Sequence, residues 1–78
     1  MLRLFASARE AAGTQQVEIN GHTVKDVLVQ AQQMYGDRFT EVLTSCRVWV
    51  NGEEVHDSTV VTDKDEIAVL PPVSGGSL

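Results

Sequence analysis

Residues 66–78 read EIAVLPPVSGGSL, and this stretch decides how the rest of the chain is organised. Apolar residues on both faces of residues 66–70 predict a β-strand at the centre of a sheet. Two prolines then end that strand, because proline has no backbone N–H to donate. The Gly-Gly pair beyond them has no Cβ atoms, so it can lie extended in a narrow slot of another protein. We therefore predict a folded domain over residues 1–72 and a flexible Gly-Gly tail over residues 73–78.

The same tail has a plainer explanation. Chain ends often fray, and Gly/Ser-rich ends are commonly flexible linkers without a function of their own. The composition of residues 73–78 leaves both explanations open. The sequence that precedes the tail is what favours a functional end.

The chain is short and acidic. At 78 residues we expect one domain with a small core, since a chain of this size buries only roughly 60% of the surface that its unfolded form exposes. Eleven acidic residues against six basic ones give a net charge of −5, which argues against nucleic acid as a partner and predicts a basic protein surface instead. The acidic residues expected to steer the chain toward that surface are Glu53, Glu54, Asp63 and Asp65. No apolar run approaches the roughly 20 residues of a membrane helix, so we expect a cytoplasmic protein that does not bind membranes.

Few residues offer chemistry of their own. Cys46 is the only cysteine, which excludes an internal disulfide, and its place between apolar segments predicts a buried, unreactive thiol. His22 and His56 lie in turn-like settings without the spacing of metal ligands. We therefore expect neither a metal site nor a catalytic side chain.

The first twenty residues predict two strands separated by a short helix. Alternation over residues 2–6 is typical of a strand with one face toward a core. Residues 8–12 are good helix formers, and Gly13 follows where a helical turn would end. Residues 16–19 then predict a second strand, antiparallel to the first, which ends at an Asn-Gly turn.

The longest helical pattern begins at Thr23, which can cap the free amides of a helix with help from Asp26. Gly36 is its natural C-terminal end. The apolar residues that recur at helical spacing along one side are Val24, Val27, Leu28, Ala31 and Met34. A second, shorter helix is predicted over residues 39–43.

The remaining elements complete a mixed sheet. Residues 47–50 predict a strand, and the Asn51-Gly52 pair is a strong signal for a hairpin into a fourth strand near Val55. Residues 60–61 add a short edge segment, and the first and last strands of the chain are the natural parallel pair at the centre. This order predicts an α+β protein with a β-grasp (ubiquitin-like) fold, a mixed four- to five-stranded sheet packed on one main helix. A ferredoxin-like fold would need a second full helix between the later strands.

Three segments together carry a family pattern. Residues 4–10 read LFASARE and are followed by Gly13, residues 50–52 read VNG, and residues 65–76 read DEIAVLPPVSGG. They resemble the MoaD family, the small subunits of molybdopterin synthase, over nearly the whole chain. The acidic turn, apolar strand and Pro-Pro-Val-Ser-Gly-Gly ending are the most specific part of the resemblance.

The resemblance implies a sulfur carrier that has no catalytic side chains and binds no cofactor itself. A MoeB-like adenylating enzyme would use ATP and Mg²⁺ to convert the carboxylate of Gly76 to an acyl-adenylate. A sulfur donor protein would then supply the sulfur of a thiocarboxylate. A MoaE-like large subunit, which would hold the active site, would receive that sulfur on a pterin precursor and complete molybdopterin for molybdenum cofactor biosynthesis.

The resemblance also assigns site residues. Gly76 matches the reacting glycine. The tail residues expected to thread into the partner are Gly75, Ser74, Val73, Pro72 and Pro71. Phe5, Arg9 and Leu70 match the partner interface, although the residues alone also allow Phe5 in the core and Arg9 as a solvated helix residue.

Ser77 and Leu78 depart from the family pattern, because they follow the Gly-Gly pair that should end the active chain. With these two residues attached, the carbonyl of Gly76 is an amide, which an adenylating enzyme of this type cannot activate. A processing peptidase would remove them, unless they are an added extension.

Other functions fit the same tail. A ubiquitin-like protein modifier would be activated in the same way and would then form isopeptides with lysines of its targets. A sulfur carrier for thiamine thiazole or cysteine synthesis would keep the thiocarboxylate and change the acceptor. A β-grasp binding module with an inert tail is the plainest alternative.

Overall fold

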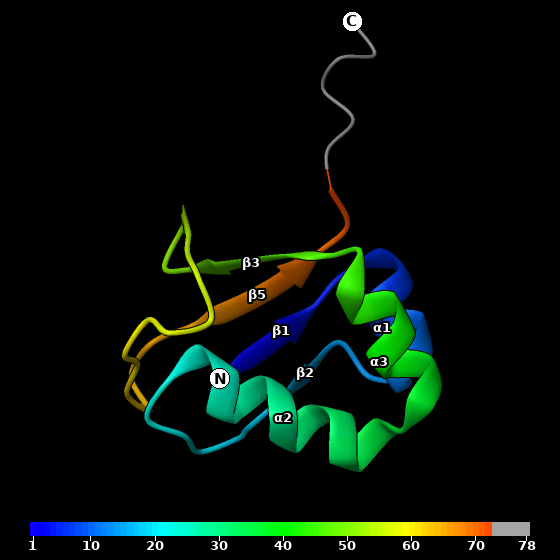
Figure 1. The fold of residues 1–78 in the computed structure, drawn as a ribbon, viewed down its shortest axis with the longest axis horizontal. Coiled ribbons are helices and arrows are strands. Elements are labelled where there is room, and N and C mark those ends of the chain that lie inside the picture. The colour runs from blue at the N-terminus through cyan, green and yellow to red at the C-terminus, as the bar shows by residue number, and fades with distance from the viewer. Residues whose placement is uncertain (73–78) are drawn as a thin grey trace, which may run out of the picture.

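The computed structural model describes residues 1–72, so the residues predicted to form the tail, 73–78, lie outside it. The described elements, in chain order, are β1 (Leu2–Leu4), α1 (Ala6–Ala12), β2 (Gln16–Val17), α2 (Val24–Tyr35), α3 (Asp37–Thr44), β3 (Arg47–Val50), β4 (Glu53–Glu54) and β5 (Ile67–Leu70). The strands form one sheet in the order β2-β1-β5-β3-β4. The helices of this part of the chain lie on one side of that sheet (Figure 1).

The centre of the sheet is a parallel pair of distant strands. β1 and β5 pair in parallel, with Leu2 opposite Ile67 and Leu4 opposite Val69. β2 is antiparallel to β1, and β3 is antiparallel to both β5 and β4. This topology is that of a β-grasp fold, so the predicted α+β class, the five-stranded mixed sheet and the central pair are confirmed.

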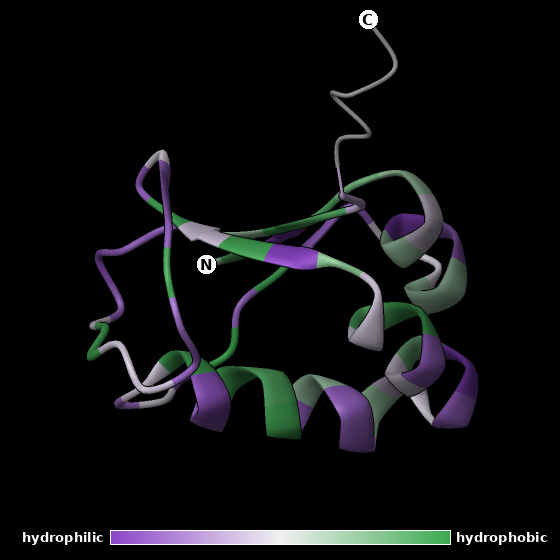
Figure 2. Ribbon diagram, turned by 45° about the horizontal axis from the view of Figure 1, so that its top comes forward, coloured by the Kyte–Doolittle hydropathy of each residue, from purple (hydrophilic) through white to green (hydrophobic). Residues whose placement is uncertain are grey.

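The core lies between the sheet and the helices. Leu2, Leu4 and Val69 are at most 1% exposed, and they face the buried side of α2. Phe39 of α3 is fully buried, and its ring lies 5.3 Å from that of Tyr35 at a tilted angle that suits aromatic pairs. Figure 2 shows hydrophobic and hydrophilic residues alternating along α2 below the sheet, as expected of a helix with one buried side.

The predicted ends of α2 are confirmed. The amide of Asp26 donates to the hydroxyl oxygen of Thr23 at 3.2 Å, and the carboxylate of Asp26 accepts from the amide of His22 at 3.2 Å. These bonds satisfy two amides near the start of the helix. Gly36 has a φ of 90°, which suits a residue without a Cβ, and its amide donates to the carbonyl of Gln32 at 2.8 Å.

Met34 is wrongly predicted as part of the apolar stripe, because its side chain is 55% exposed. At about 100° per residue, Met34 lies roughly 80° from the middle of the stripe that Val24 begins. Tyr35 lies closer to that middle and packs against the core instead. The stripe therefore ends at Ala31, which is fully buried.

Other predicted boundaries shift by a few residues. The first strand ends at Leu4, because Ala6 takes a positive φ of 49° and already begins α1. The second strand stops at Val17 instead of Ile19. Val60 makes an isolated bridge with Thr23 and is 74% exposed. α1 and α3 are both longer than predicted, and α2 is the longest of the described helices, as expected of the main one.

Candidate functional site

The strand register gathers two of the three predicted interface residues where β5 ends. Leu70 lies opposite Arg47 of β3 on one side. On the other side the amide of Phe5 donates to the carbonyl of Val69 at 3.1 Å, which extends the pairing of β1 with β5 by one residue and sets Phe5 beside Leu70. We call the row Phe5, Leu70 and Arg47 the exit row, because Pro71 and Pro72 follow it directly. Pro71 is partly buried and Pro72 is exposed.

A second row lies one step back along the same face of the sheet. Arg3 of β1 is opposite Ala68, and Ala68 is opposite Trp49, which in turn is opposite Glu54 of β4. Successive residues of a strand point to opposite faces, so these side chains lie on the side away from the buried Leu4 and Val69. We call this side, with the exit row, the open face. The helices among residues 1–72 leave it uncovered (Figure 1).

Phe5 belongs to the open face and not to the core. Its side chain is 42% exposed, although it follows the fully buried end of β1. Its backbone also starts α1, because the carbonyl of Phe5 accepts from the amides of Ala8 at 3.1 Å and Arg9 at 3.4 Å. An exposed aromatic side chain anchored by its own backbone is the kind of group that dominates protein interfaces.

Arg9 lies next to this row in a small hollow. The hollow measures about 220 Å³ and is lined by Arg3, Leu4, Phe5, Arg9, Gln15 and Gln16. Arg9 is exposed and makes no ion pair with any residue of the 1–72 part. Phe5, Arg9 and Leu70 thus lie around one end of the open face, and their role as a partner interface stays a prediction.

Paired charges flank the apolar residues of the open face. Arg3 pairs with Glu66, and the guanidinium of Arg47 lies 2.6 Å from the carboxylate of Glu54. The side chains in both pairs are roughly half exposed, so each pair contributes only about 0–1 kcal/mol. Apolar residues ringed by charged ones resemble the core and rim of a protein interface.

Trp49 is held in the middle of this face. Its side chain is only partly exposed, and its indole nitrogen is buried without a hydrogen-bond partner among the described residues. A buried N–H without an acceptor costs free energy. The strand contacts of Trp49 therefore offset the free-energy cost of its unpaired N–H. Trp49 is the only tryptophan of the chain, and a partner docked on the open face would change its surroundings.

Cys46 precedes Arg47 and lies close to the exit row. Burial raises the pKa of its thiol, and a hydrogen bond with Ser7 opposes that rise without cancelling it. A thiol with a raised pKa is less often the nucleophilic thiolate. The prediction of an unreactive thiol agrees with this shift, although Cys46 is only partly buried.

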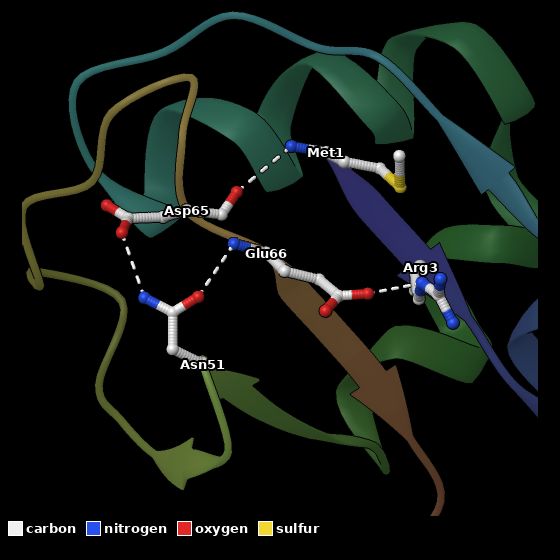
Figure 3. Close-up of polar contacts among 5 residues, drawn as sticks. All are labelled: Met1, Arg3, Asn51, Asp65 and Glu66. Carbon is white, nitrogen blue, oxygen red and sulfur yellow. Dashed lines mark hydrogen bonds and ion pairs between the residues drawn. The ribbon is translucent and has the colours of Figure 1, made fainter.

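The opposite end of β5 is fixed by a polar network that the sequence analysis did not foresee (Figure 3). The side chain of Asn51 donates to the carboxylate of Asp65 at 2.9 Å and accepts from the amide of Glu66 at 3.0 Å. The terminal amino group of Met1 donates to the carbonyl of Asp65 at 3.0 Å. Asn51 has a φ of 50°, and its Asn-Gly signal predicted the turn but not this bridge.

Asp65 is the group in this network whose protonation is perturbed. The amide of Thr62 donates to its carboxylate at 2.8 Å, and the Asn51 side chain adds a second bond. These bonds, that from Thr62 first, lower the pKa of Asp65, because they favour its charged form. The network therefore keeps the start of β5 in place around a carboxylate.

A wider hollow lies away from these residues. It measures about 800 Å³ and lies between the first half of α2 and residues 61–63, with Lys25, Asp26 and Val29 in its lining. Of the residues that the sequence predicted to act within residues 1–72, its lining includes only the acidic residue Asp63. The residues predicted to thread into the partner, Val73, Ser74 and Gly75, and the predicted reacting residue Gly76 fall outside the described part.

Two further features of residues 1–72 bear on function. No helix in this range has the length and apolar character needed to cross a membrane. Nor do three or more His, Cys, Asp or Glu side chains gather there in a way that could hold a metal ion.

Comparisons with known proteins give a consistent picture. A sequence model described as the ThiS family matches residues 2–76. The molybdopterin synthase sulfur carrier subunit of Arabidopsis thaliana is 35% identical over 77 residues, which cover 94% of this chain and 78% of the plant protein. The protein of the same name from Chlamydomonas reinhardtii is 35% identical over 92% of each chain. The solution structure of small archaeal modifier protein 1 from Methanosarcina acetivorans matches with a TM-score of 0.84 at 33% identity, covering 96% of this chain and 93% of that one.

Proposed function

This chain belongs to the ThiS family, and on that premise we propose that it is a sulfur carrier that holds sulfur as a thiocarboxylate at Gly76. The match of the family to residues 2–76 is the observation that carries the proposal, because it includes the whole tail motif and stops at Gly76. It confirms the family resemblance of the sequence. Ser77 and Leu78 lie beyond the matched range.

The proposed chemistry takes place at the end of the chain. The carboxylate of Gly76 attacks the α-phosphate of ATP on an adenylating enzyme, and pyrophosphate leaves. A persulfide of the donor protein then displaces AMP from the acyl carbon and forms an acyl disulfide. A thiol, which ends as a disulfide with the donor sulfur, cleaves that S–S bond and releases the thiocarboxylate. Glycine suits the first two steps, because no side chain hinders its carbonyl and the tail can be placed in line for attack.

In this proposal, residues 1–72 supply the surface that docks on the protein that receives the tail. The exit row places Phe5 and Leu70 beside the point where the tail begins, so a surface that receives the tail also meets this end of the open face. Pro71 and Pro72 restrict the conformations that the tail loses on docking, which lowers the entropic cost of binding.

The acceptor we propose is a pterin precursor held by a MoaE-like large subunit. The two plant and algal relatives, each named as the sulfur carrier subunit of molybdopterin synthase, support this choice over thiazole or cysteine synthesis. In that complex this chain is the small subunit and supplies sulfur, while the large subunit supplies the catalytic side chains. ATP and Mg²⁺ belong to the MoeB-like adenylating enzyme.

In this proposal the chain is inert as long as Ser77 and Leu78 follow Gly76. Activation needs a free carboxylate at Gly76, and with these residues attached the carbonyl of Gly76 is an amide. We propose that a peptidase removes Ser77 and Leu78 before activation.

Intact mass measurement tests the proposal directly. Two forms of the chain, full length and ending at Gly76, are incubated with the MoeB-like enzyme, the sulfur donor, ATP and Mg²⁺. We expect the shorter form to gain the mass of one sulfur in place of one oxygen, and only when ATP is present. Thiocarboxylate on the full-length chain with Ser77 and Leu78 still attached would contradict the precursor role. No sulfur gain on either form would contradict the carrier function itself.

A protein modifier is the second candidate, and the likeness to small archaeal modifier protein 1 favours it. A modifier would form an isopeptide between Gly76 and a lysine of its target. Lys64 is the last basic residue of the chain, so trypsin would leave residues 65–76 attached to the modified lysine. Finding that remnant on proteins of the source cell would favour a modifier, and its absence from cells that make thiocarboxylate would favour the carrier.

A further inference from the structure

Charges on the open face are ordered along its strands. Arg47 lies in the exit row, and its partner Glu54 lies in the next row back, opposite Trp49. Arg3 lies in that second row, and its partner Glu66 precedes β5 still further from the exit. In each pair the arginine is therefore nearer the exit than the glutamate, as Figure 3 shows for Arg3 and Glu66.

These pairs leave the arginines available to another protein. The Arg47 side chain is 57% exposed and that of Arg3 is 49% exposed. An exposed ion pair gains little over two hydrated ions, so a carboxylate of a docking partner can replace or join the glutamate. A planar guanidinium can also bind two carboxylates at once through its several N–H groups.

Arg9 adds a third positive charge at the same end. It shares its hollow with Arg3, Gln15 and Gln16. None of these lining side chains is acidic, and Arg9 has no ion pair within the described residues. Arginine and carboxamide donors around a hollow of about 220 Å³ suit a carboxylate.

Of the acidic residues expected to steer docking, Glu54 pairs with Arg47, whereas Asp63 and Asp65 precede β5 at the end away from the exit row. Asp65 is six residues before Pro71, which in extended chain is roughly 20 Å. Glu53 lies opposite Val50, which is three residues along β3 from Arg47 of the exit row, or roughly 10 Å. Screening in physiological salt acts over about 8 Å, so these charges contribute little at the exit row. The net charge of −5 therefore does not describe the surface that surrounds the tail.

We propose that the protein that receives the tail presents carboxylates to Arg9 and Arg47, on the two sides of the exit row. This inference rests on the proposed function, because it concerns the partner that the tail enters. It reverses, at the exit row, the expectation from net charge that a basic surface receives Glu53, Glu54, Asp63 and Asp65.

Two matched double variants test the inference. Arg9→Gln with Arg47→Gln removes two positive charges at the exit row. Glu53→Gln with Asp63→Asn removes two negative charges at the other end, from exposed residues without an ion pair among residues 1–72. Each variant is made in the form that ends at Gly76, which keeps every described residue. Circular dichroism and thermal unfolding confirm that both are folded.

The measurement is the association rate constant with the MoeB-like enzyme and with the MoaE-like subunit, at low and at physiological salt. We expect the arginine variant to associate about tenfold more slowly at low salt and with a weaker salt dependence, since opposite charges steer docking. The acidic variant should associate within about twofold of the wild type.

The opposite pattern, slow association of the acidic variant alone, would overturn the inference in favour of a basic partner surface. Equal rates for all three proteins would also overturn it. In both cases sulfur gain by the wild-type chain would leave the proposed function standing. If the wild-type chain neither binds these proteins nor gains sulfur, the proposed function fails, and the inference fails with it.

Discussion

The two faces of the sheet are made by the same strands and have opposite character. On the covered face, Leu2, Leu4 and Val69 are at most 1% exposed. On the open face, Phe5 is 42% exposed, and Leu70 beside it is only partly buried. The alternation of side chains along a strand produces both faces from one short run of residues.

This difference separates stability from recognition. Apolar side chains on the covered face leave water when the chain folds, at about 25 cal/mol per Å². The exposed area of Phe5 gains nothing from folding and stays available to a partner. Substitutions on the covered face should therefore change the free energy of unfolding, and those on the open face should change the affinity for a partner.

The largest effect on stability should come from Phe39→Ala on the covered side. Phe39 is fully buried, so its loss leaves a cavity and should lower the free energy of unfolding by about 3–5 kcal/mol. Phe5→Ala is the matched control and should cost less than about 1 kcal/mol. Denaturant unfolding measures both. Equal losses of unfolding free energy in the two variants would contradict the difference between the two faces, because Phe5 would then belong to the core.

A substitution in the tail should slow adenylation strongly and leave the folded domain unchanged. Gly75→Val adds a branched side chain where the proposed slot admits only glycine, and should slow adenylation by about 100-fold. Gly75→Ala should fall between this variant and the wild type. Adenylation with purified enzyme measures the effect, and the unfolding midpoint should stay constant. Normal adenylation of Gly75→Val would contradict threading of the tail.

Docking itself should depend on the aromatic side chain of the open face. Phe5→Ala should weaken binding to the MoaE-like subunit by about 2 kcal/mol, roughly 30-fold, because buried aromatic anchors carry much of the energy of an interface. Val60→Ala is the control, since Val60 is apolar and 74% exposed but lies away from the exit row. Titration calorimetry measures both affinities. A similar loss in both variants would point to a general effect of exposed apolar area.

Substitutions at the end of β5 away from the tail should have a smaller effect, and only on the free energy of unfolding. Asn51→Ala loses two hydrogen bonds and places a Cβ residue without a polar side chain at a φ of 50°, which should cost about 1–2 kcal/mol. Asn51→Gly loses the same bonds without the backbone strain and should cost less. Thermal unfolding distinguishes them. A change in partner affinity for either variant would show that this end also takes part in docking.

The smallest effect should be a loss of stability in acid. The folded-state pKa of Asp65 is lowered by hydrogen bonds from Thr62 and Asn51, so its contribution is complete above the ordinary value of about 3.9 and is lost as the pH falls through the lower folded value. Unfolding of the wild type and of Asp65→Asn is compared at pH 6 and in this acid range. The two curves should converge in acid, and parallel curves would contradict the role of the Asp65 carboxylate.

Much of the fold could be predicted because its signals are local. The cap at Thr23, the end at Gly36 and the Asn51-Gly52 turn each depend on a few neighbouring residues, and all three are confirmed. Met34 was wrong because a residue near the end of a helix can satisfy the spacing rule and still lie beside the apolar stripe. The bridge from Asn51 to Asp65 was missed because its partners are 14 residues apart.

The sequence by itself determined the fold class, the central pair of strands and the tail motif that identifies the family. The tertiary structure alone decided that Phe5 is exposed, that Arg3 and Arg47 lie nearer the exit than the glutamates they pair with, and that Asn51 joins Asp65 and Glu66 at the other end of β5. The physical reason is that patterns of period two or 3.6 and caps act between near neighbours, whereas the sheet register joins residues far apart in the chain, such as Leu2 of β1 and Ile67 of β5. Net charge adds all residues together, and only the register says where along the sheet each charge lies.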